Sequence, residues 1–199
     1  KYKDINGDGT ITAAQDQGYF GKSSRPTHTG SLNIFGDWKG FDFDMLFSWG
    51  LDNVVALTGV YTATGSSGVQ DNTSFTKPFY HGGNSPTFLV EKSWTPENPN
   101  AEFPRLEIPG PSNNNGFSST FWYRSGDYLR LKTAQIGYNF SKKMLKPLGV
   151  EGVRLYVEGY NLLTFSGLTK YNIDPESPSV NNGYYPQQRT YTMGVKVTF

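Results

Sequence analysis

The chain of 199 residues has no cysteine, no long apolar run and almost no net charge, and each lack excludes a class of protein. Without cysteine it has no disulfide framework, no thiolate metal site and no thiol catalysis. The best aliphatic run, residues 54–57, is far shorter than the about 20 apolar residues of a membrane-spanning helix. With 18 basic and 17 acidic residues, bulk charge recruits neither nucleic acid nor an anionic membrane.

Patterns of catalytic residues are also missing. His28 and His81 are far apart and have no companion ligands nearby, and there is no nucleophile elbow or phosphate loop. Asp42 and Asp44 are the only closely spaced acids inside a strand-like segment. A glycoside hydrolase fragment needs two carboxylates across a cleft, so this alternative is weak. We predict that the chain is not an enzyme.

Aromatic residues and glycine are abundant, with 13 Tyr, 14 Phe and 23 Gly, which favours strands and turns over helices. The start, residues 1–4, is charged but has no apolar core of a signal peptide behind it. The chain is therefore expected to be either cytoplasmic or a mature or partial chain.

Five segments alternate between apolar and polar side chains, which predicts strands with two different faces. The predicted strands are about 27–38, 41–51, 126–140, 152–164 and 188–199. In 41–51 the odd positions are bulky and apolar: Phe41, Phe43, Met45, Phe47, Trp49 and Leu51. In 126–140 the alternation changes phase midway, which predicts a β-bulge near Lys132 and Thr133.

The connections between these strands alternate in length. Turns 39–40 and 141–151 are short, the second with room for one short helix, whereas loops 52–125 and 165–187 are long. Transmembrane barrels have short periplasmic turns and long extracellular loops, and five strands cannot close a barrel. We predict an all-β fold that is part of a transmembrane antiparallel β-barrel. The alternative is a secreted, calcium-stabilised β-sandwich that binds carbohydrate.

Residues 1–26 are predicted to form an extracellular loop with an EF-hand-like calcium motif. Acidic and amide side chains at positions 1, 3 and 5 of such a loop supply oxygens to Ca²⁺, and a glycine at position 6 permits the sharp turn. The twelfth position holds a glutamine instead of glutamate. The candidate ligands are Asp4, Asn6, Asp8, the Thr10 carbonyl, Gln15 and Asp16. The alternative is a metal-free turn, which Asn-Gly and Asp-Gly form unaided.

Aromatic residues in the first long loop are candidates for ligand binding. Trp94, Phe121, Trp122 and Tyr123 can stack on sugar rings or on an apolar ligand. The alternative for each of them is packing within the loop. Within the strand 152–164, Arg154 and Glu158 share one face and are candidates for an ion pair.

An ordered set of motifs extends over essentially the whole chain. The motifs are 4–11 (DINGDGTI), 94–100 (WTPENPN), 125–132 (SGDYLRLK), 137–138 (GY), 154–156 (RLY), 159–164 (GYNLLT), 174–176 (DPE) and 185–194 (YPQQRTYTMG), before the terminal Phe199. In this order they resemble the SusC/RagA family of TonB-linked outer-membrane proteins.

The resemblance implies more than the periodicity does. Residues 27–199 would be C-terminal strands of a 22-stranded TonB-dependent receptor barrel in the bacterial outer membrane. The family's plug and TonB-contacting segment precede these strands. A SusD-like surface lipoprotein would cap the barrel, and TonB–ExbB–ExbD would power the import of an oligosaccharide (glycan uptake) or of a peptide. The apolar face would contact outer-membrane lipid.

Overall fold

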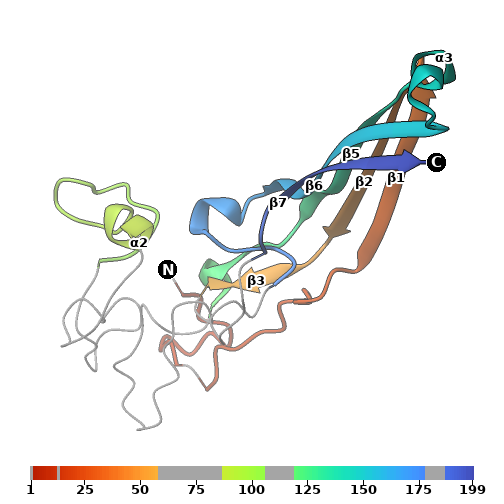
Figure 1. Ribbon diagram of the computed structural model, residues 1–199. Coiled ribbons are helices and arrows are strands. Elements are labelled where there is room, and N and C mark those ends of the chain that lie inside the picture. Colours follow the sequence, from red (N-terminus) through yellow and green to blue (C-terminus); the bar gives the residue numbers. More distant parts are fainter. Residues whose placement is uncertain (1, 13, 58–86, 106–118, 178–186) are drawn as a thin grey trace, which may run out of the picture. The chain divides into compact units, whose positions relative to one another are not determined.

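A single sheet of five long antiparallel strands dominates the computed structural model (Figure 1). The structure describes residues 2–12, 14–57, 87–105, 119–177 and 187–199. The chain divides into two compact units. Unit 1 comprises residues 1–22, 55–124 and 179–184, and unit 2 comprises residues 23–54, 125–178 and 185–199. The five-stranded sheet lies in unit 2, and each unit is described by itself.

The strand order in the sheet is β1-β2-β5-β6-β7, so every strand pairs with the next long strand along the chain. The strands are β1 (His28–Trp38), β2 (Phe41–Leu51), β5 (Tyr128–Asn139), β6 (Gly152–Ser166) and β7 (Thr190–Thr198). These bounds lie within two residues of the ranges that the alternation predicts. Neighbours in the sheet are thus neighbours in chain order, although two of the four connections are long.

The phase change in β5 is a β-bulge, as the sequence predicts. Thr133 lies opposite Leu46 of β2, whereas Leu131 lies opposite Phe47, so Lys132 is the extra residue. The register with β6 shifts at the same place. The bulge lets the residues on both sides of it keep their apolar side chains on one face.

Two tight connections close one end of the sheet. Lys39 (φ 50°) and Gly40 (φ 92°) form the turn between β1 and β2. The short helices α3 (Lys142–Leu145) and η3 (Lys146–Leu148) join β5 to β6, and Gly149 (φ 66°) ends η3. In the described part of the chain, no helix is both long and apolar enough to cross a membrane.

The first long loop contains short elements that the alternation of the sequence does not predict. They are β3 (Val54–Ala56), α2 (Thr87–Glu91), η2 (Thr120–Trp122) and β4 (Tyr123–Ser125), and β3 pairs with β4. In unit 1, the rings of Phe103 and Trp122 stack with centroids 6.2 Å apart, and both side chains are buried. Elements of three to five residues are too short to show a period, so only packing reveals them.

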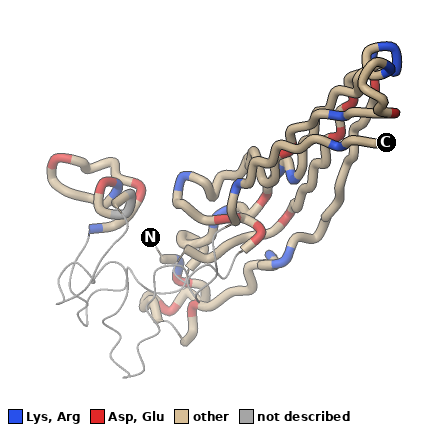
Figure 2. Tube along the Cα trace, in the orientation of Figure 1, with Lys and Arg blue, Asp and Glu red and all other residues tan. Residues whose placement is uncertain are grey.

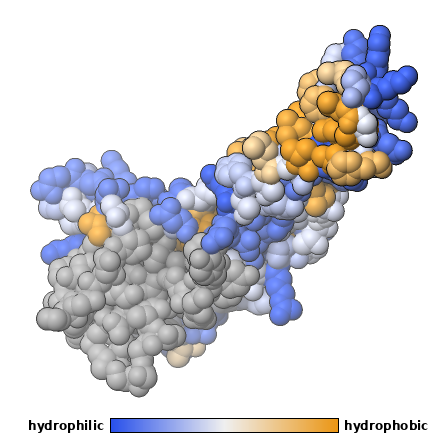
Figure 3. Space-filling view, viewed as in Figure 1, coloured by the Kyte–Doolittle hydropathy of each residue, from blue (hydrophilic) through white to orange (hydrophobic). Residues whose placement is uncertain are grey.

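The two faces of the five-stranded sheet are exposed in the opposite sense to those of a water-soluble protein. Phe43, Ile136, Val157 and Met193 lie opposite one another across four strands, and all four are exposed. The neighbouring acids Asp42 and Asp44 are only half-exposed. Figure 3 shows apolar side chains gathered over the strands near α3.

We call this exposed surface the apolar face. Its members are Leu32, Ile34 and Trp38 of β1, Phe41, Phe43, Met45 and Leu51 of β2, Leu129 and Ile136 of β5, Leu155, Val157, Leu163 and Phe165 of β6, and Tyr191, Met193, Val195 and Val197 of β7. A β-sandwich would cover these side chains with a second sheet. Their exposure contradicts that alternative.

On the opposite, polar face, glycines make room for large side chains of neighbouring strands. Gly137 and Gly194 both lie opposite Tyr156. A Cβ added at Gly137 would lie 2.6 Å from Nη2 of Arg154, and one at Gly194 would lie 2.5 Å from the Tyr156 hydroxyl. These large polar side chains therefore lie flat along the sheet over glycine.

We expect Gly137→Val to destabilise the sheet by about 1–3 kcal/mol, because the new side chain forces Arg154 out of position. The temperature at which the full protein converts from its folded to its unfolded band on a detergent gel measures the effect. Gly152→Val, on the polar face of β6, is the control. A Cβ added at Gly152 would lie 3.7 Å from Thr198, which is an ordinary van der Waals contact. Equal effects of both substitutions would contradict the steric explanation.

Candidate functional site

The polar face carries two clusters of charged side chains, and Figure 2 marks the charged positions along the backbone of the strands. The first is near the turns. Arg154 of β6 donates to Asp42 of β2, with Nε to Oδ2 at 2.9 Å, and to Oε1 of Gln135 at 2.7 Å. Asn139 donates to the same carboxylate at 2.6 Å. Arg154 is therefore paired across two strand boundaries with Asp42.

The prediction of an ion pair between Arg154 and Glu158 is wrong, because Arg154 pairs with Asp42. Glu158 instead accepts a hydrogen bond from the Tyr160 hydroxyl at 2.7 Å. Along one strand, residues four apart are separated by roughly 13 Å, whereas Asp42, two strands away from Arg154, is separated from it by about 10 Å. The cross-strand partner is closer, and only the strand order identifies it.

The second cluster joins β5 to the loop after β6. Nη2 of Arg130 lies 2.7 Å from Oδ1 of Asp174, and Nη1 lies 2.6 Å from Oε2 of Glu176. Lys132 reaches the same glutamate at 2.8 Å, and the Tyr128 hydroxyl donates to it at 3.3 Å. Arg130 is only 2% exposed, so this ion cluster is largely withdrawn from water.

The ion cluster fixes the first part of the second long loop against the sheet. Residues 167–177 contain η4 (Thr169–Tyr171) and bury Leu168, Tyr171 and Ile173. In the sequence, 125–132 and 174–176 are two separate motifs, and no pattern predicts that they meet. Because they are 44 residues apart, alternation along each strand carries no signal for this contact.

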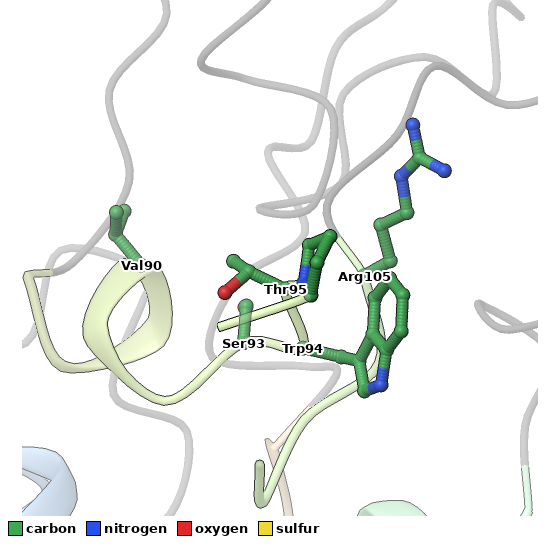
Figure 4. A pocket seen from close by; sticks show the side chains of 6 residues that line it. Val90, Ser93, Trp94, Thr95 and Arg105 are labelled. Atoms are coloured by element: carbon green, nitrogen blue, oxygen red, sulfur yellow. The ribbon is translucent and has the colours of Figure 1, made fainter. Parts of the chain in front are cut away.

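The four candidate ligand-binding aromatics have different environments. Trp94 is 38% exposed and lines a cavity of about 370 Å³ with Val90, Ser93, Thr95, Pro96 and Arg105. In Figure 4 the indole of Trp94 lies beside the aliphatic part of Arg105, whose guanidinium points away from it. Phe121 and Tyr123 are also partly exposed.

Trp122 does not fit the predicted role. It is 1% exposed and packs edge-on against Phe121, with ring centroids 4.9 Å apart, as well as against Phe103. A ring enclosed in this way has no free face for a ligand, so Trp122 is a core residue of unit 1.

The predicted calcium loop is a series of tight turns held by its own acids. Asp4 accepts hydrogen bonds from the backbone N–H of Gly7 and Gly9, at 2.6 and 2.8 Å. Asp8 accepts one from the N–H of Thr10 at 2.8 Å. Gly7 and Gly9 have φ of 77° and 82°, which side chains rarely adopt. The side chains of the motif therefore converge on their own turn.

The last two candidate ligands close the loop through hydrogen bonds of their own. Asp16 accepts from the N–H of Ile5 and of Thr12, both at 2.7 Å. The Thr12 and Ile5 donors hold the pKa of Asp16 below its ordinary value, so this carboxylate stays ionised at neutral pH. The side chain of Gln15 accepts from the Thr12 hydroxyl at 3.3 Å.

Among the described residues, no three carboxylate, imidazole or thiolate side chains gather as a metal site. A cation at this loop would depend on the Asn6 amide oxygen and backbone carbonyls as well as on Asp4 and Asp8. Such a mixed oxygen set suits Ca²⁺.

Strand order, register and inverted faces define the class of fold. It is all-β, a section of an antiparallel β-barrel with the apolar face on one side of the sheet and the charged clusters on the other. The chain is similar to part of a SusC/RagA-like TonB-dependent transporter.

Similarity to curated proteins covers the whole chain. It is 29% identical, over its full length, to TonB-dependent receptor P3 and to TonB-dependent receptor P26 of Formosa agariphila. The chain spans about a fifth of these relatives, 19% of each. No family model matches the chain.

Solved structures share the fold. The RagAB peptide importer in its open-open state superimposes on 96% of this chain with a TM-score of 0.61 and 21% identity, and the chain covers 19% of that protein. A second structure, of the RagAB peptide transporter, gives a TM-score of 0.63 at 20% identity, with 96% of this chain and 19% of the other covered.

We expect Arg130→Met to release the segment 167–177 from the sheet, because Asp174 and Glu176 lose their buried cation. Breaking a buried ion pair from one side costs about 3–5 kcal/mol. Limited proteolysis of the full protein would show new cleavage within 167–177 and an earlier thermal transition.

Lys132→Met is the matched control, since Lys132 is 33% exposed and a partly exposed pair contributes about 0–1 kcal/mol. If both variants resist protease as well as the parent protein does, the ion cluster does not hold the loop.

Proposed function

We propose that this chain is a section of the wall of an outer-membrane transporter that imports large nutrients under the control of TonB. The observation that carries the proposal is the exposed apolar face on five strands, opposite a polar face that is half-buried on β2, β5 and β6. Lipid accepts apolar side chains, and paired strands satisfy the backbone groups inside it. Similarity to TonB-dependent receptors supports the same function.

The alternation of connection lengths supports an orientation. The turns 39–40 and 141–151 would face the periplasm, and the loops 52–125 and 165–187 would face the outside. In this orientation the residues 1–26 are also outside. Because the chain spans about a fifth of its relatives, the plug and the contact with TonB would belong to other parts of the protein.

A lipoprotein of the SusD kind is the proposed partner at the outer surface. The structural neighbours are named as RagAB assemblies, which supports a partner of this kind. Segment 167–177, fixed by the ion cluster, would offer that partner a rigid part of an outer loop.

The imported nutrient is proposed to be an oligosaccharide or a peptide. The cavity at Trp94 and Arg105 suits either, because an indole stacks on sugar rings and a guanidinium binds carboxylates. The neighbouring structures are named as peptide importers, and that name describes those proteins only.

Uptake by cells that express the full protein tests the function and the cavity together. We expect uptake of a labelled oligosaccharide mixture or peptide mixture that disappears when TonB is absent. Trp94→Ala should raise the concentration for half-maximal uptake about fivefold, the equivalent of roughly 1 kcal/mol of lost stacking.

Tyr19→Ala is the control, since Tyr19 is almost fully exposed and lies outside the cavity. Uptake of neither mixture, or uptake that persists without TonB, would refute the transport proposal. Unchanged uptake by Trp94→Ala would refute only the role of the cavity in binding the nutrient and would leave the transport proposal standing.

We also propose that the loop at residues 4–16 binds one Ca²⁺ with a structural role. Asp4, Asn6 and Asp8 would supply side-chain oxygens, and Thr10 would supply its carbonyl. The turns at Gly7 and Gly9 support this, because they bring these groups together before any ion binds.

Calorimetric titration of the full protein should show binding of Ca²⁺ that Asp8→Ala abolishes, since a ligand and a turn acceptor are both lost. Asp37→Ala, at an exposed acid of β1, is the control and should leave the titration unchanged. Equal titrations for the parent protein and Asp8→Ala would rule out this site.

A further inference from the structure

The closed end of the sheet carries a concentration of lysines. The turn 39–40 and the connection 141–151 together contain Lys39, Lys142, Lys143 and Lys146, against one acid, Glu151. Hydrogen bonds from Asn139 to Gly40 (2.7 Å) and from Glu151 to Thr198 (2.9 Å) hold both connections at the same end of the sheet. Figure 2 shows the basic residues of the α3 turn together at its tip. We call these four lysines the basic tip.

None of the four lysines makes an ion pair with the described residues. Lys142, Lys143 and Lys146 are exposed, and the ammonium of Lys39 lies 4.7 Å from the ring centre of Trp38. A cluster of like charges without counter-charges is unfavourable by itself. The basic tip therefore has the charge to bind an anion.

Apolar side chains are exposed within the same connection. Met144 is 57% exposed and Leu148 is 71% exposed, whereas Leu145 between them is buried and anchors the turn. Figure 3 shows the hydrophilic tip directly beside the apolar surface of the strands. A free anion needs no apolar neighbours, but an anion attached to a hydrocarbon chain does.

Aromatic rings mark the boundary between the basic tip and the apolar face. Phe41 and Tyr138 have ring centroids 4.7 Å apart, and Phe140 lies 5.1 Å from Tyr138. Trp38, next to Lys39, is exposed on the same face. Aromatic rings are enriched where a membrane's hydrocarbon meets its headgroups, and lysines extend beyond that level.

We infer that the basic tip binds the phosphate headgroups of anionic phospholipids, with Met144 and Leu148 inserted among the first carbons of their chains. An ammonium group offers three N–H donors to phosphate oxygens. This inference rests on the proposed function, because it requires the apolar face to lie in a bilayer. It adds that the protein binds one class of lipid, anionic phospholipid, in the leaflet at the closed end of the sheet.

The test is retention of lipid by the full protein, purified in detergent and titrated separately with phosphatidylglycerol and with phosphatidylcholine. Native mass spectrometry counts the lipids that remain bound. We expect a preference for phosphatidylglycerol that falls at least tenfold in Lys142→Gln/Lys143→Gln/Lys146→Gln, since each lysine at an anionic surface contributes about fivefold. Met144→Ser/Leu148→Ser should weaken retention of both lipids.

A variant with the same loss of charge elsewhere, Lys3→Gln/Lys92→Gln/Lys170→Gln, is the control and should keep the preference. Equal retention of the two lipids by the parent protein would refute the inference. So would an unchanged preference in the variant of the basic tip, or full displacement by millimolar inorganic phosphate, which would indicate a free-anion site.

TonB-dependent uptake is measured on the same variants to separate the two proposals. Normal uptake by a protein that shows no preference for phosphatidylglycerol would refute only the inference about the basic tip. A protein that neither enters the outer membrane nor mediates uptake would instead refute the proposed function.

Discussion

The structure depends on one constraint: side chains two positions apart on a strand lie on the same face of the sheet, so alternation gathers most of the bulky apolar side chains on one face. Here that face is exposed, and the row of Phe43, Ile136, Val157 and Met193 shows that the register aligns it across strands. In water this arrangement would be unfavourable, at about 25 cal/mol for each Å² of exposed apolar surface. In a bilayer the same exposure becomes the favourable state, since backbone groups are already paired along the ladder.

On the polar face, ion pairs and hydrogen bonds hold the strands and a loop together, as apolar contacts do in a protein core. Arg154 of β6 is paired with Asp42 of β2 across β5, and Arg130 of β5 is paired with Asp174 and Glu176 of the loop after β6. Glycines such as Gly137 allow these long side chains to lie flat on the sheet. Removal of one charged partner leaves the other without its counter-charge at a partly buried site, which costs more stability than the loss of an isolated surface ion pair.

Regular alternation made most of the sheet predictable. The phase change at Lys132 identified the bulge, because a one-residue insertion is the simplest way to keep Leu131 and Ile136 on one face. Candidate sites were less predictable. Trp122 looked like a ligand contact because it is aromatic and lies in a loop, yet it is buried against Phe103. The basic tip was not predicted either, because the net charge of the whole chain, which is near zero, does not show where in the fold the lysines lie.

The sequence by itself determined which residues form the five long strands, which face each of their side chains takes and where the two short turns lie, because these depend on neighbours one or two positions away. Only the tertiary structure decided that the partner of Arg154 is Asp42, that Arg130 meets Asp174, and that Lys39 lies at the same end as Lys142. Those pairs are separated by 112, 44 and about 100 residues, and no local period reaches that far. Strand order brings them together, and strand order is a property of the folded sheet.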